Sequence, residues 1–478
     1  MVMLSMKISK EIGLSFDDVL LVPNKNIFGS RSNISLRTKL TRNIELNTPI
    51  VSANMDTITS SQMAIAMAES GGIGIIHRFN TIQEEMEEVE KVKRKSSFII
   101  KNPYTIAIDK TVGDVKNLIN KTGVSGFPVV DIRNKTKLLG IVTLRDIKFQ
   151  SDNNKISDIM TPKKDLITIL SNKNLNATFF LDMFKKYKFE KIPIIDSKFN
   201  LIALVAAKDI FDIRNNITSK NKDGKLMVGA AVGIKSDAIE RIEKLYDAEA
   251  DAVVIDIAHG HSIQAINLIQ KIKKDFDIDI IAGNVATKQG TLDLIKAGAD
   301  AIKVGIGPGH VCTTRLVTGA GVPQLTAISW AYSIAKDYDV PIIADGGINN
   351  SGDIVKALAS GASSVMIGKL FAGTDETPGS TIIKNGKKYK FYRGMSSISA
   401  NSKKLSVDMS GEISIDTIGE GKESFVPYVG SVKEIIVQLV GGIKSGFSYC
   451  GSKNLEQLRR NAEFIILSKG AQKESFVR

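Results

Sequence analysis

Eight stretches of the chain are short, apolar and rich in β-branched residues, and each is bounded by glycine, proline or polar residues. Strands of a parallel sheet are buried on both faces, so they appear in a sequence as continuous hydrophobic runs of this kind. We therefore predict eight strands, at Pro49–Met55, Gly71–His77, Leu226–Val232, Ala252–Ala258, Asp279–Val285, Ala301–Gly307, Pro341–Gly347 and Ser364–Leu370.

Segments with a helical spacing of apolar residues lie between most of these runs, at Ser61–Ser70, Ala238–Tyr246, Ser262–Lys274, Gln289–Ala297 and Ser351–Ser360. Strand alternating with helix predicts parallel βαβ units, and eight such strands predict an α/β fold of the (β/α)8 TIM-barrel type. An open doubly wound sheet is the alternative, but no Gly-x-Gly-x-x-Gly follows the first strand.

Residues 96–216 interrupt the barrel pattern between its second and third strands, and they contain an internal repeat. Gly-Phe-Pro-Val-Val-Asp at 126–131 is echoed by Lys-Ile-Pro-Ile-Ile-Asp at 191–196. A repeated pattern predicts two similar units packed as a pseudo-symmetric pair. We therefore expect residues 1–95 and 217–478 to form the barrel, with 96–216 as an inserted domain.

The composition is that of a globular protein, with 43% hydrophobic and 24% charged residues. Lys and Arg exceed Asp and Glu by 64 − 51 = 13, but the basic clusters are short and lack interleaved aromatics. A solvated surface is therefore expected rather than a DNA-binding face. Two cysteines, no secretory signal and no membrane-spanning apolar run predict a cytoplasmic protein, and no Cys/His spacing suits zinc.

The eleven residues Gly305–Arg315, Gly-Ile-Gly-Pro-Gly-His-Val-Cys-Thr-Thr-Arg, carry the densest chemistry. Three alternate glycines follow a predicted strand, so the backbone can turn sharply and approach a ligand closely. The loop presents Cys312 beside two hydroxyls and a guanidinium, which makes this thiol a candidate nucleophile. The alternative is that Cys312 is a buried small hydrophobic residue.

Asp345-Gly346-Gly347 ends the seventh predicted strand. A carboxylate there can accept hydrogen bonds from both vicinal hydroxyls of a ribose, and the glycines expose N–H groups to a phosphate. Gly368, after the eighth strand, extends this cradle. The alternative for Asp345 is a helix N-cap.

Seven motifs together resemble the IMP dehydrogenase / GMP reductase family, in order along the whole barrel. They are Ala53–Thr57, Gly71–Gly74, Asp256–Ser262, Ala282–Thr287, Gly305–Arg315, Ala344–Ile348 and Tyr392–Ser397. The resemblance implies that Cys312 attacks C2 of a purine mononucleotide to form a covalent thioimidate, beside a nicotinamide cofactor. It also implies a homotetramer or octamer, and a potassium ion at the carbonyls of Gly307, Gly309 and Cys312.

The same resemblance implies two sets of binding residues. The substrate set comprises Met55, Gly309, His310, Asp345, Gly346, Gly347, Gly368, Lys369, Tyr392, Gly394, Met395, Ser396 and Gly421. The cofactor set comprises Asp256, Ala258, Asn284, Gly305 and Gly307. Two positions depart from the family: His310 stands where a phosphate-binding serine is usual, and Lys369 stands where a small residue is usual.

The inserted domain resembles a tandem of CBS domains, which in other proteins bind adenine or guanine nucleotides. By this resemblance, ATP or GTP would lie against Thr143, Asp146 and Asp209. Ala206 replaces the threonine expected before Asp209, so the second site departs from the pattern. A purely structural or oligomerising role is the alternative.

Two reactions are open to the family. A dehydrogenase oxidises IMP with NAD and then hydrolyses the thioimidate with an Arg-Tyr pair on a flap, whereas a reductase uses NADPH and a Thr-Glu relay. The flap Ile398–Glu420 contains no arginine and no tyrosine, while Thr314 and Glu420 are both present.

We therefore expect Cys312, Thr314 and Glu420 to catalyse an NADPH-dependent reduction of GMP. The NAD-dependent dehydrogenase is the alternative, because the insertion, Ala258–Ser262 and Ser445–Gly451 look like bacterial dehydrogenases. An inactive nucleotide-sensing homologue is a third reading.

Overall fold

The computed structural model describes residues 8–474 except 27–28, 96–98, 101–102, 123, 172–176, 208–216, 398–399 and 401–418. The chain divides into two compact units. One comprises Met1–Lys95 and Ile217–Arg478, and the other comprises Ser96–Asn216.

Eight parallel strands close the larger unit into a barrel, which confirms the predicted fold class. They are β4 (Ile50–Ser52), β5 (Ile73–Ile76), β14 (Val228–Val232), β15 (Ala252–Asp256), β16 (Asp279–Val285), β17 (Ala301–Val304), β18 (Ile342–Asp345) and β19 (Ser364–Ile367). Their order around the barrel is β14-β15-β16-β17-β18-β19-β4-β5. Each lies within a predicted run, and most end earlier than the run does because the glycine-rich residues beyond form loops.

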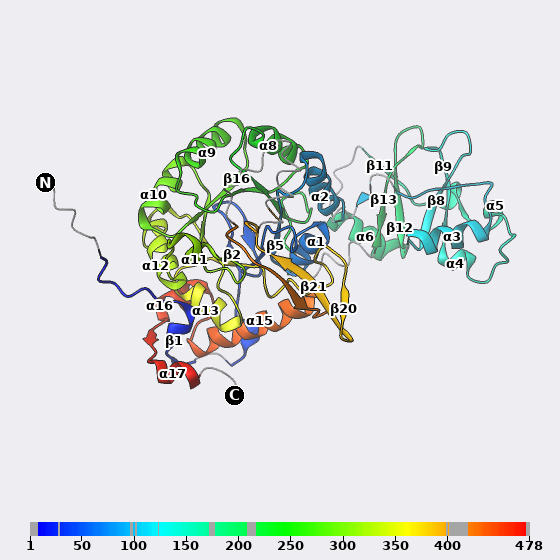
Figure 1. Ribbon diagram of the computed structural model, residues 1–478. Coiled ribbons are helices and arrows are strands. Elements are labelled where there is room, and N and C mark those ends of the chain that lie inside the picture. The colour runs from blue at the N-terminus through cyan, green and yellow to red at the C-terminus, as the bar shows by residue number, and fades with distance from the viewer. Residues whose placement is uncertain are drawn as a thin grey trace. The chain divides into compact units, whose positions relative to one another are not determined.

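Helices surround the strands, as Figure 1 shows for α8, α9, α10 and α12. The ring consists of α1 (Ser61–Glu69), α2 (Ile82–Lys95), α8 (Ala238–Asp247), α9 (Ile263–Asp275), α10 (Lys288–Ala297), α12 (Gln324–Ala335), α13 (Ser351–Ala359) and α15 (Val432–Tyr449). Side-chain caps begin several of them: Thr287 accepts from the Gly290 N–H, and Asn350 accepts from the Asp353 N–H.

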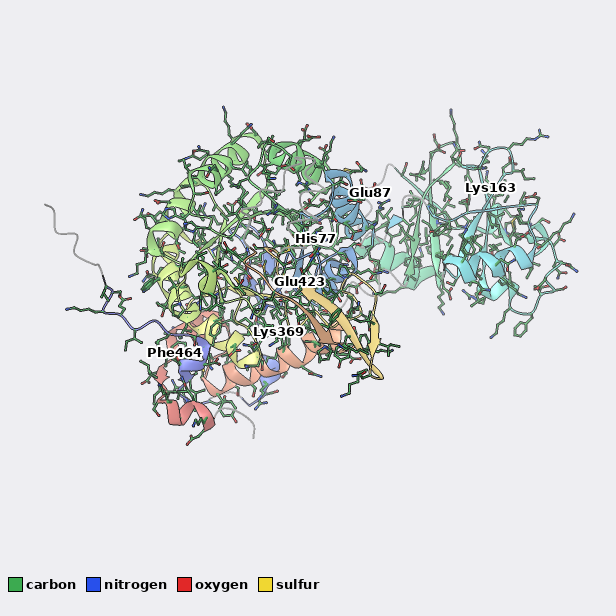
Figure 2. All side chains as sticks on the ribbon, viewed as in Figure 1. His77, Glu87, Lys163, Lys369, Glu423 and Phe464 are labelled. Atoms are coloured by element: carbon green, nitrogen blue, oxygen red, sulfur yellow. The ribbon has the colours of Figure 1, made fainter. Side chains whose placement is uncertain are left out.

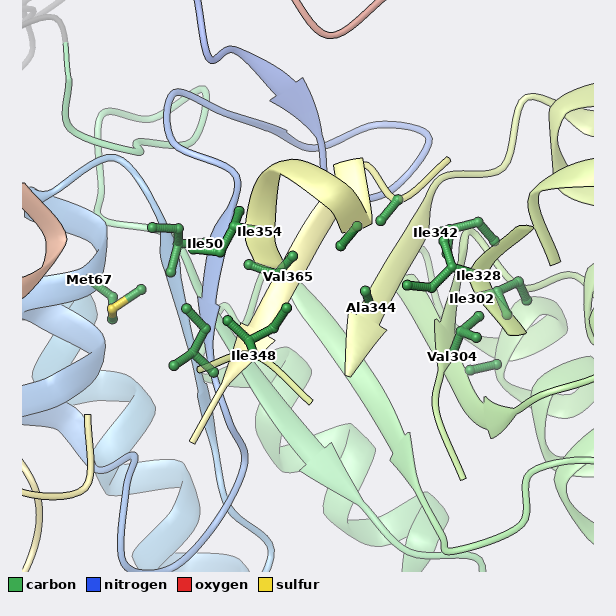
Figure 3. Close-up of a cluster of buried hydrophobic side chains, with 14 of the residues drawn as sticks. Ile50, Met67, Ile302, Val304, Ile328, Ile342, Ala344, Ile348, Ile354 and Val365 are labelled. Carbon is green, nitrogen blue, oxygen red and sulfur yellow. The ribbon is translucent and has the colours of Figure 1, made fainter. Parts of the chain in front are cut away.

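The core has two layers because strand side chains alternate between the barrel interior and the helices. Ile302, Val304, Ile342 and Ala344 belong to the outer layer, between the strands and the helices (Figure 3). The inner cluster contains side chains from the intervening strand positions, such as Ile281 and Ile343, together with Leu40 and Leu46. Leu40 follows β2 (Thr38–Lys39) and Leu46 ends β3 (Glu45–Leu46), so this hairpin packs into the barrel interior.

Short strands outside the barrel join distant parts of the chain. The N-terminal strand β1 (Val19–Leu21) pairs antiparallel with β23 (Phe464–Ile466). After β19, strands β20 (Ile382–Lys384), β21 (Lys387–Arg393) and β22 (Glu423–Pro427) form a three-stranded antiparallel sheet. The sequence analysis did not predict these elements, since their residues are polar, exposed or too few to show a period.

The smaller unit contains the internal repeat as two similar four-stranded sheets. In one, β8 (Gly126–Val130) pairs with β9 (Leu138–Thr143); in the other, β12 (Lys191–Ile195) pairs with β13 (Leu201–Ala206). Both antiparallel pairs are irregular at the same step, Val129/Val130 and Ile194/Ile195. The identity of this unit as a CBS pair stays a prediction.

Among the described residues, no helix is both long enough and apolar enough to cross a membrane.

Candidate active site

The loop after β17 has a backbone that only glycine can adopt at its start. Gly305 has φ +148°, and a Cβ there would lie 2.1 Å from the carbonyl oxygen of Asp345. Gly307 has φ +78°, and a Cβ there would meet the Arg315 side chain at 2.5 Å. Because Gly305 has no side chain, the loop packs closely against the end of β18, and Cys312 lies at the C-terminal rim of the barrel.

Cys312, Thr314 and Glu420 form a continuous hydrogen-bonded chain. The Cys312 thiol donates to Thr314 Oγ1 at 3.1 Å, and that hydroxyl donates to Glu420 Oε2 at 2.7 Å. Backbone contacts hold the distant glutamate in place: the Thr313 N–H donates to the Glu420 carbonyl, and Cys312 pairs with Gly421 in an antiparallel bridge. A thiol and a carboxylate are therefore connected through one hydroxyl.

Arg315, the last residue of the loop motif, supports the loop. Its Nε donates to the Ile306 carbonyl at 3.2 Å, and its Nη2 donates to the Val322 carbonyl at 2.6 Å. Both bonds satisfy backbone acceptors, so the guanidinium fixes the loop conformation.

Two adjoining cavities meet at the mouth of the barrel, with volumes of about 220 and 150 Å³. The larger is lined by the predicted residues Met55, Asp256, Ala258, Asn284, Gly305, Gly307, Gly309, Cys312, Thr314, Asp345, Gly346, Tyr392, Gly394, Met395, Ser396 and Glu420. The smaller adds His310, Gly347, Gly368 and Lys369. Gly421 lines neither cavity but packs on Gly394, where an added Cβ would lie 3.2 Å from the Gly394 Cα.

The smaller cavity is glycine-walled and carries cationic or hydrogen-bonding side chains. Gly346 and Gly347 have φ +92° and +84°, and a Cβ on Gly368 would lie 3.2 Å from both Met55 Sδ and Tyr392 Oη. Burial and the nearby Asp345 carboxylate raise the pKa of the Tyr392 hydroxyl, which therefore stays protonated and able to donate.

His310 and Lys369, the two departures from the family pattern, both line this smaller cavity. Lys369 lies two residues beyond β19, and its side chain is labelled on the larger unit in Figure 2. Burial and the Lys369 ammonium lower the pKa of His310, so the imidazole is neutral near pH 7.

Charged side chains of alternating sign line the larger cavity. Arg78 Nε lies 3.1 Å from Asp256 Oδ2, and Lys303 Nζ lies 2.7 Å from Asp345 Oδ2. Burial acts to raise the pKa of Asp256, but the Arg78 and Lys303 cations and a hydrogen bond from Asn54 outweigh it, and the pKa is lowered. Asp256 is therefore ionised.

Sequence reasoning missed Arg78 and Lys303. A lysine inside the apolar run Ala301–Val304 was the available signal for Lys303. Arg78 follows an apolar strand without any distinguishing pattern.

The predicted regulatory residues lie in the smaller unit. Asp146 Oδ2 accepts from the Thr143 N–H at 2.7 Å and from its hydroxyl at 2.8 Å, in a capping box that begins α4 (Leu144–Ile147). Asp209 falls outside the described residues, and nucleotide binding at these positions stays a prediction. Within the described part of the chain, no group of three or more His, Cys, Asp or Glu side chains could hold a metal ion.

A (β/α)8 barrel whose rim carries a hydrogen-bonded cysteine and a glycine-walled polar cavity is typical of a barrel enzyme with its site at the C-terminal ends of the strands. Residues 13–478 match the IMP dehydrogenase / GMP reductase domain. The chain belongs to this family, which makes it an oxidoreductase of purine metabolism that uses a nicotinamide cofactor and a purine mononucleotide substrate.

Relatives named inosine-5′-monophosphate dehydrogenase match almost the whole chain. The one from Nitrosopumilus maritimus is 50% identical over 97% of both chains, and the one from Aquifex aeolicus is 48% identical over 97% of this chain and 95% of its own. Among solved structures, a GMP reductase from Trypanosoma brucei in complex with guanosine 5′-monophosphate superposes with a TM-score of 0.91. It is 40% identical and covers 98% of both chains.

The expectation of a GMP reductase as the main reading is wrong, because relatives at 42–50% identity across the whole chain are named IMP dehydrogenases. The error came from the weight placed on the missing Arg-Tyr pair of the flap. The absence of that pair from Ile398–Glu420 counted for more in that expectation than the likeness of Ala258–Ser262 and Ser445–Gly451 to the dehydrogenases. Residues 401–418 of the flap fall outside the described residues.

Proposed function

We propose that the protein is an IMP dehydrogenase, which oxidises IMP to XMP with NAD. The observation that carries this proposal is the match along almost the whole chain to relatives named IMP dehydrogenase. The contacts from Cys312 through Thr314 to Glu420 would supply the nucleophile and the base that the reaction needs. The direction of the reaction is supported by the full-length relatives named IMP dehydrogenase.

The reaction has two stages that share one covalent intermediate. The Cys312 thiolate would add to C2 of the purine. NAD, when held against Asp256, Asn284 and Gly305, would supply the acceptor for the hydride lost from C2. The product of this stage is a thioimidate, with C2 bonded to the sulfur. Water then adds to C2, the C–S bond breaks, and XMP and the free thiol are released. Overall, IMP, NAD and water give XMP, NADH and a proton.

Thr314 and Glu420 are suited to activating the water. Because the Thr314 hydroxyl donates its hydrogen to Glu420, its oxygen can accept a proton from a neighbouring water while its own passes to the carboxylate. The same hydroxyl also contacts the sulfur at 3.1 Å, so a water bound to it would lie near the carbon attached to Cys312.

In this proposal the nucleotide spans the two adjoining cavities. The cationic and glycine-lined walls around Lys369 and Gly346 suit the 5′-phosphate, and the Asp345 carboxylate suits the ribose hydroxyls. Met55, Met395 and Ser396 line the larger cavity around Cys312, where the purine base would lie.

NAD would lie against Asp256, Ala258, Asn284, Gly305 and Gly307, which line the larger cavity. Gly305 and Gly307 fix the backbone of this wall, because an added Cβ would collide with the Asp345 carbonyl oxygen and with the Arg315 side chain. The ionised Asp256, paired with Arg78, offers acceptor oxygens for ribose or carboxamide groups.

The candidate potassium site uses backbone carbonyls of Gly307, Gly309 and Cys312. Neutral carbonyl oxygens suit a monovalent cation, whereas divalent cations favour carboxylates. The Gly309 carbonyl accepts a hydrogen bond from the Cys312 N–H, so the loop turns tightly between these two residues. Replacing potassium with lithium should lower the turnover rate if this site is occupied; an unchanged rate would exclude it.

The smaller unit is proposed to bind ATP or GTP near Thr143 and Asp146, in a homotetramer or octamer. Each nucleotide is titrated into the full chain while light scattering monitors the molecular mass. This experiment tests nucleotide binding and the oligomeric state together. Absence of binding and of any change in mass would reject them.

The absorbance of the reduced nicotinamide distinguishes oxidation of IMP from reduction of GMP. IMP with NAD should give many turnovers of NADH, with XMP as the product. Oxidation of NADPH with GMP, together with no turnover of IMP, would overturn the main proposal.

A further inference from the structure

Lys303 is a buried lysine in the wall of the active-site cavity. It lies in β17 between Ile302 and Val304, and its side chain is only 3% exposed. Burying an ammonium group in a protein interior is unfavourable unless it is paired with a carboxylate and hydrogen-bonded. The inner cluster beside it is apolar, as Ile281 and Ile343 illustrate. A lysine at this position therefore requires a specific partner.

The partner is Asp345, and Asn284 completes a triangle. Lys303 Nζ donates to Asp345 Oδ2 at 2.7 Å and also to Asn284 Oδ1. The Asn284 Nδ2 group donates to the same Asp345 Oδ2 at 2.9 Å and to the Gly305 carbonyl at 2.8 Å. The three residues come from adjacent strands β16, β17 and β18, so the geometry is set by the barrel itself.

Both donors bond the same oxygen of the carboxylate. Oδ2 is therefore occupied, whereas no hydrogen bond among the described residues uses Oδ1. A carboxylate held through one oxygen has a fixed plane, and its other oxygen remains an acceptor for the cavity that Asp345 lines. Two vicinal ribose hydroxyls need such a fixed acceptor, because a rotating carboxylate would lose rotamer entropy on binding.

A second buried lysine shows what a purely structural pair looks like. Lys93 Nζ lies 2.6 Å from Asp251 Oδ2, with side chains 4% and 9% exposed. Neither residue lines the two active-site cavities. This pair therefore matches the burial and chemistry of Lys303–Asp345 without access to substrate.

We propose that Lys303 is a positioning residue that orients Asp345 toward the ribose, so that the preference for a 2′-hydroxyl on the substrate depends on Lys303. The proposal rests on the proposed function only in the choice of IMP as the nucleotide. It assigns to Lys303 a role in sugar selectivity that is separate from the covalent chemistry at Cys312.

The test measures binding, without turnover. Calorimetry gives the dissociation constants of IMP and 2′-deoxy-IMP for two proteins. One is the Cys312→Ala variant, which keeps Lys303, and the other carries both Cys312→Ala and Lys303→Met. With Lys303 the ribonucleotide should bind about 10- to 100-fold more tightly, as expected for a hydrogen bond to a charged group. In Lys303→Met the two constants should come within about three-fold of each other.

Two further variants make the result decisive. Lys93→Met should lower the melting temperature and leave the IMP to 2′-deoxy-IMP ratio unchanged. Lys303→Arg keeps a cation at the site and should retain part of the selectivity for IMP over 2′-deoxy-IMP. This variant replaces Lys303→Met if Lys303→Met does not fold.

Equal weakening of both nucleotides in Lys303→Met, with the ratio unchanged, would overturn the proposal. If the protein binds GMP instead of IMP, the same comparison is made with GMP and 2′-deoxy-GMP. A failure of the proposed function is thereby distinguished from a failure of this inference.

Discussion

Thr314 Oγ1 lies 2.7 Å from Glu420 Oε2, although 106 positions separate the two residues in the chain. The first begins the short helix α11 (Thr314–Thr318), and the second directly precedes the glycine that pairs with Cys312. The bond therefore joins the loop Gly305–Arg315 to the last residue of the flap. It places a carboxylate one hydroxyl away from the Cys312 thiol.

Glu420→Gln should slow hydrolysis of the covalent intermediate more than its formation. General base catalysis contributes about 10²–10⁴ in rate, so the steady-state turnover rate should fall by about that factor. Rapid-mixing experiments should show a burst of NADH stoichiometric with active sites, followed by slow turnover. Glu434→Gln, an exposed change in the first turn of α15, is the control. If both the burst and the steady-state turnover are lost, Glu420 acts in the formation of the covalent intermediate instead.

Cys312→Ala should abolish turnover and leave the melting temperature nearly unchanged, because the proposed mechanism forms its covalent bond through this thiol. Cys450 is the matched control, since it is 2% exposed, lies at the end of α15, and burial raises its pKa. Iodoacetamide should therefore label Cys312 and spare Cys450, and IMP should protect Cys312. Turnover retained in Cys312→Ala would remove the proposed mechanism.

Binding of the phosphate should depend on pH through His310. Burial and Lys369 hold the pKa of the free imidazole below its ordinary value of 6.5. A bound dianion stabilises the imidazolium and raises that pKa, so binding should take up protons as the pH falls through this range. The other titratable groups lining the cavity are Asp345, Lys369 and Tyr392.

IMP affinity is measured from pH 5.5 to 8.5, about one unit or more on each side of an ordinary histidine pKa. The unsubstituted protein should bind IMP more tightly than His310→Ser does, and the difference in affinity should grow as the pH falls. Lys369→Met should weaken IMP about ten-fold and move the pH dependence upward, because the nearby charge that lowers the pKa of His310 is lost. Parallel pH profiles in all three proteins would contradict this prediction.

Gly305→Ala should destroy activity, because its Cβ would lie 2.1 Å from the Asp345 carbonyl oxygen and the residue has φ +148°. The substitution must move the end of β18 or the loop, and displacements of about 1 Å near reacting groups cost about 100-fold in rate. Gly441→Ala is the matched control. This glycine lies inside α15 with no neighbouring atom within 4 Å of an added Cβ, and alanine there should stabilise the protein by about 0.5–1 kcal/mol. Equal activity in both variants would contradict the close approach at Gly305.

The eight barrel strands could be predicted from the sequence because strands buried on both faces are continuously apolar, as Ala252–Asp256 and Ala301–Val304 are. The hairpin β2–β3 and the sheet β20–β22 could not, since their strands are short or largely exposed. Cys312 and Asp345 were also accessible to sequence reasoning, because each follows or ends an apolar run beside glycines that mark a turn toward a ligand.

The sequence by itself therefore determined the barrel, the rim at which the nucleophile stands and the family to which the chain belongs. Only the tertiary structure decided how charges meet across strands: Lys303 with Asp345, Arg78 with Asp256, and Thr314 with Glu420. The physical reason is that periodicity and turn chemistry are local along the chain, whereas barrel closure brings together side chains from strands far apart in sequence. The partner of a lysine in a hydrophobic strand can be identified only when the tertiary structure shows which neighbouring strand supplies a carboxylate.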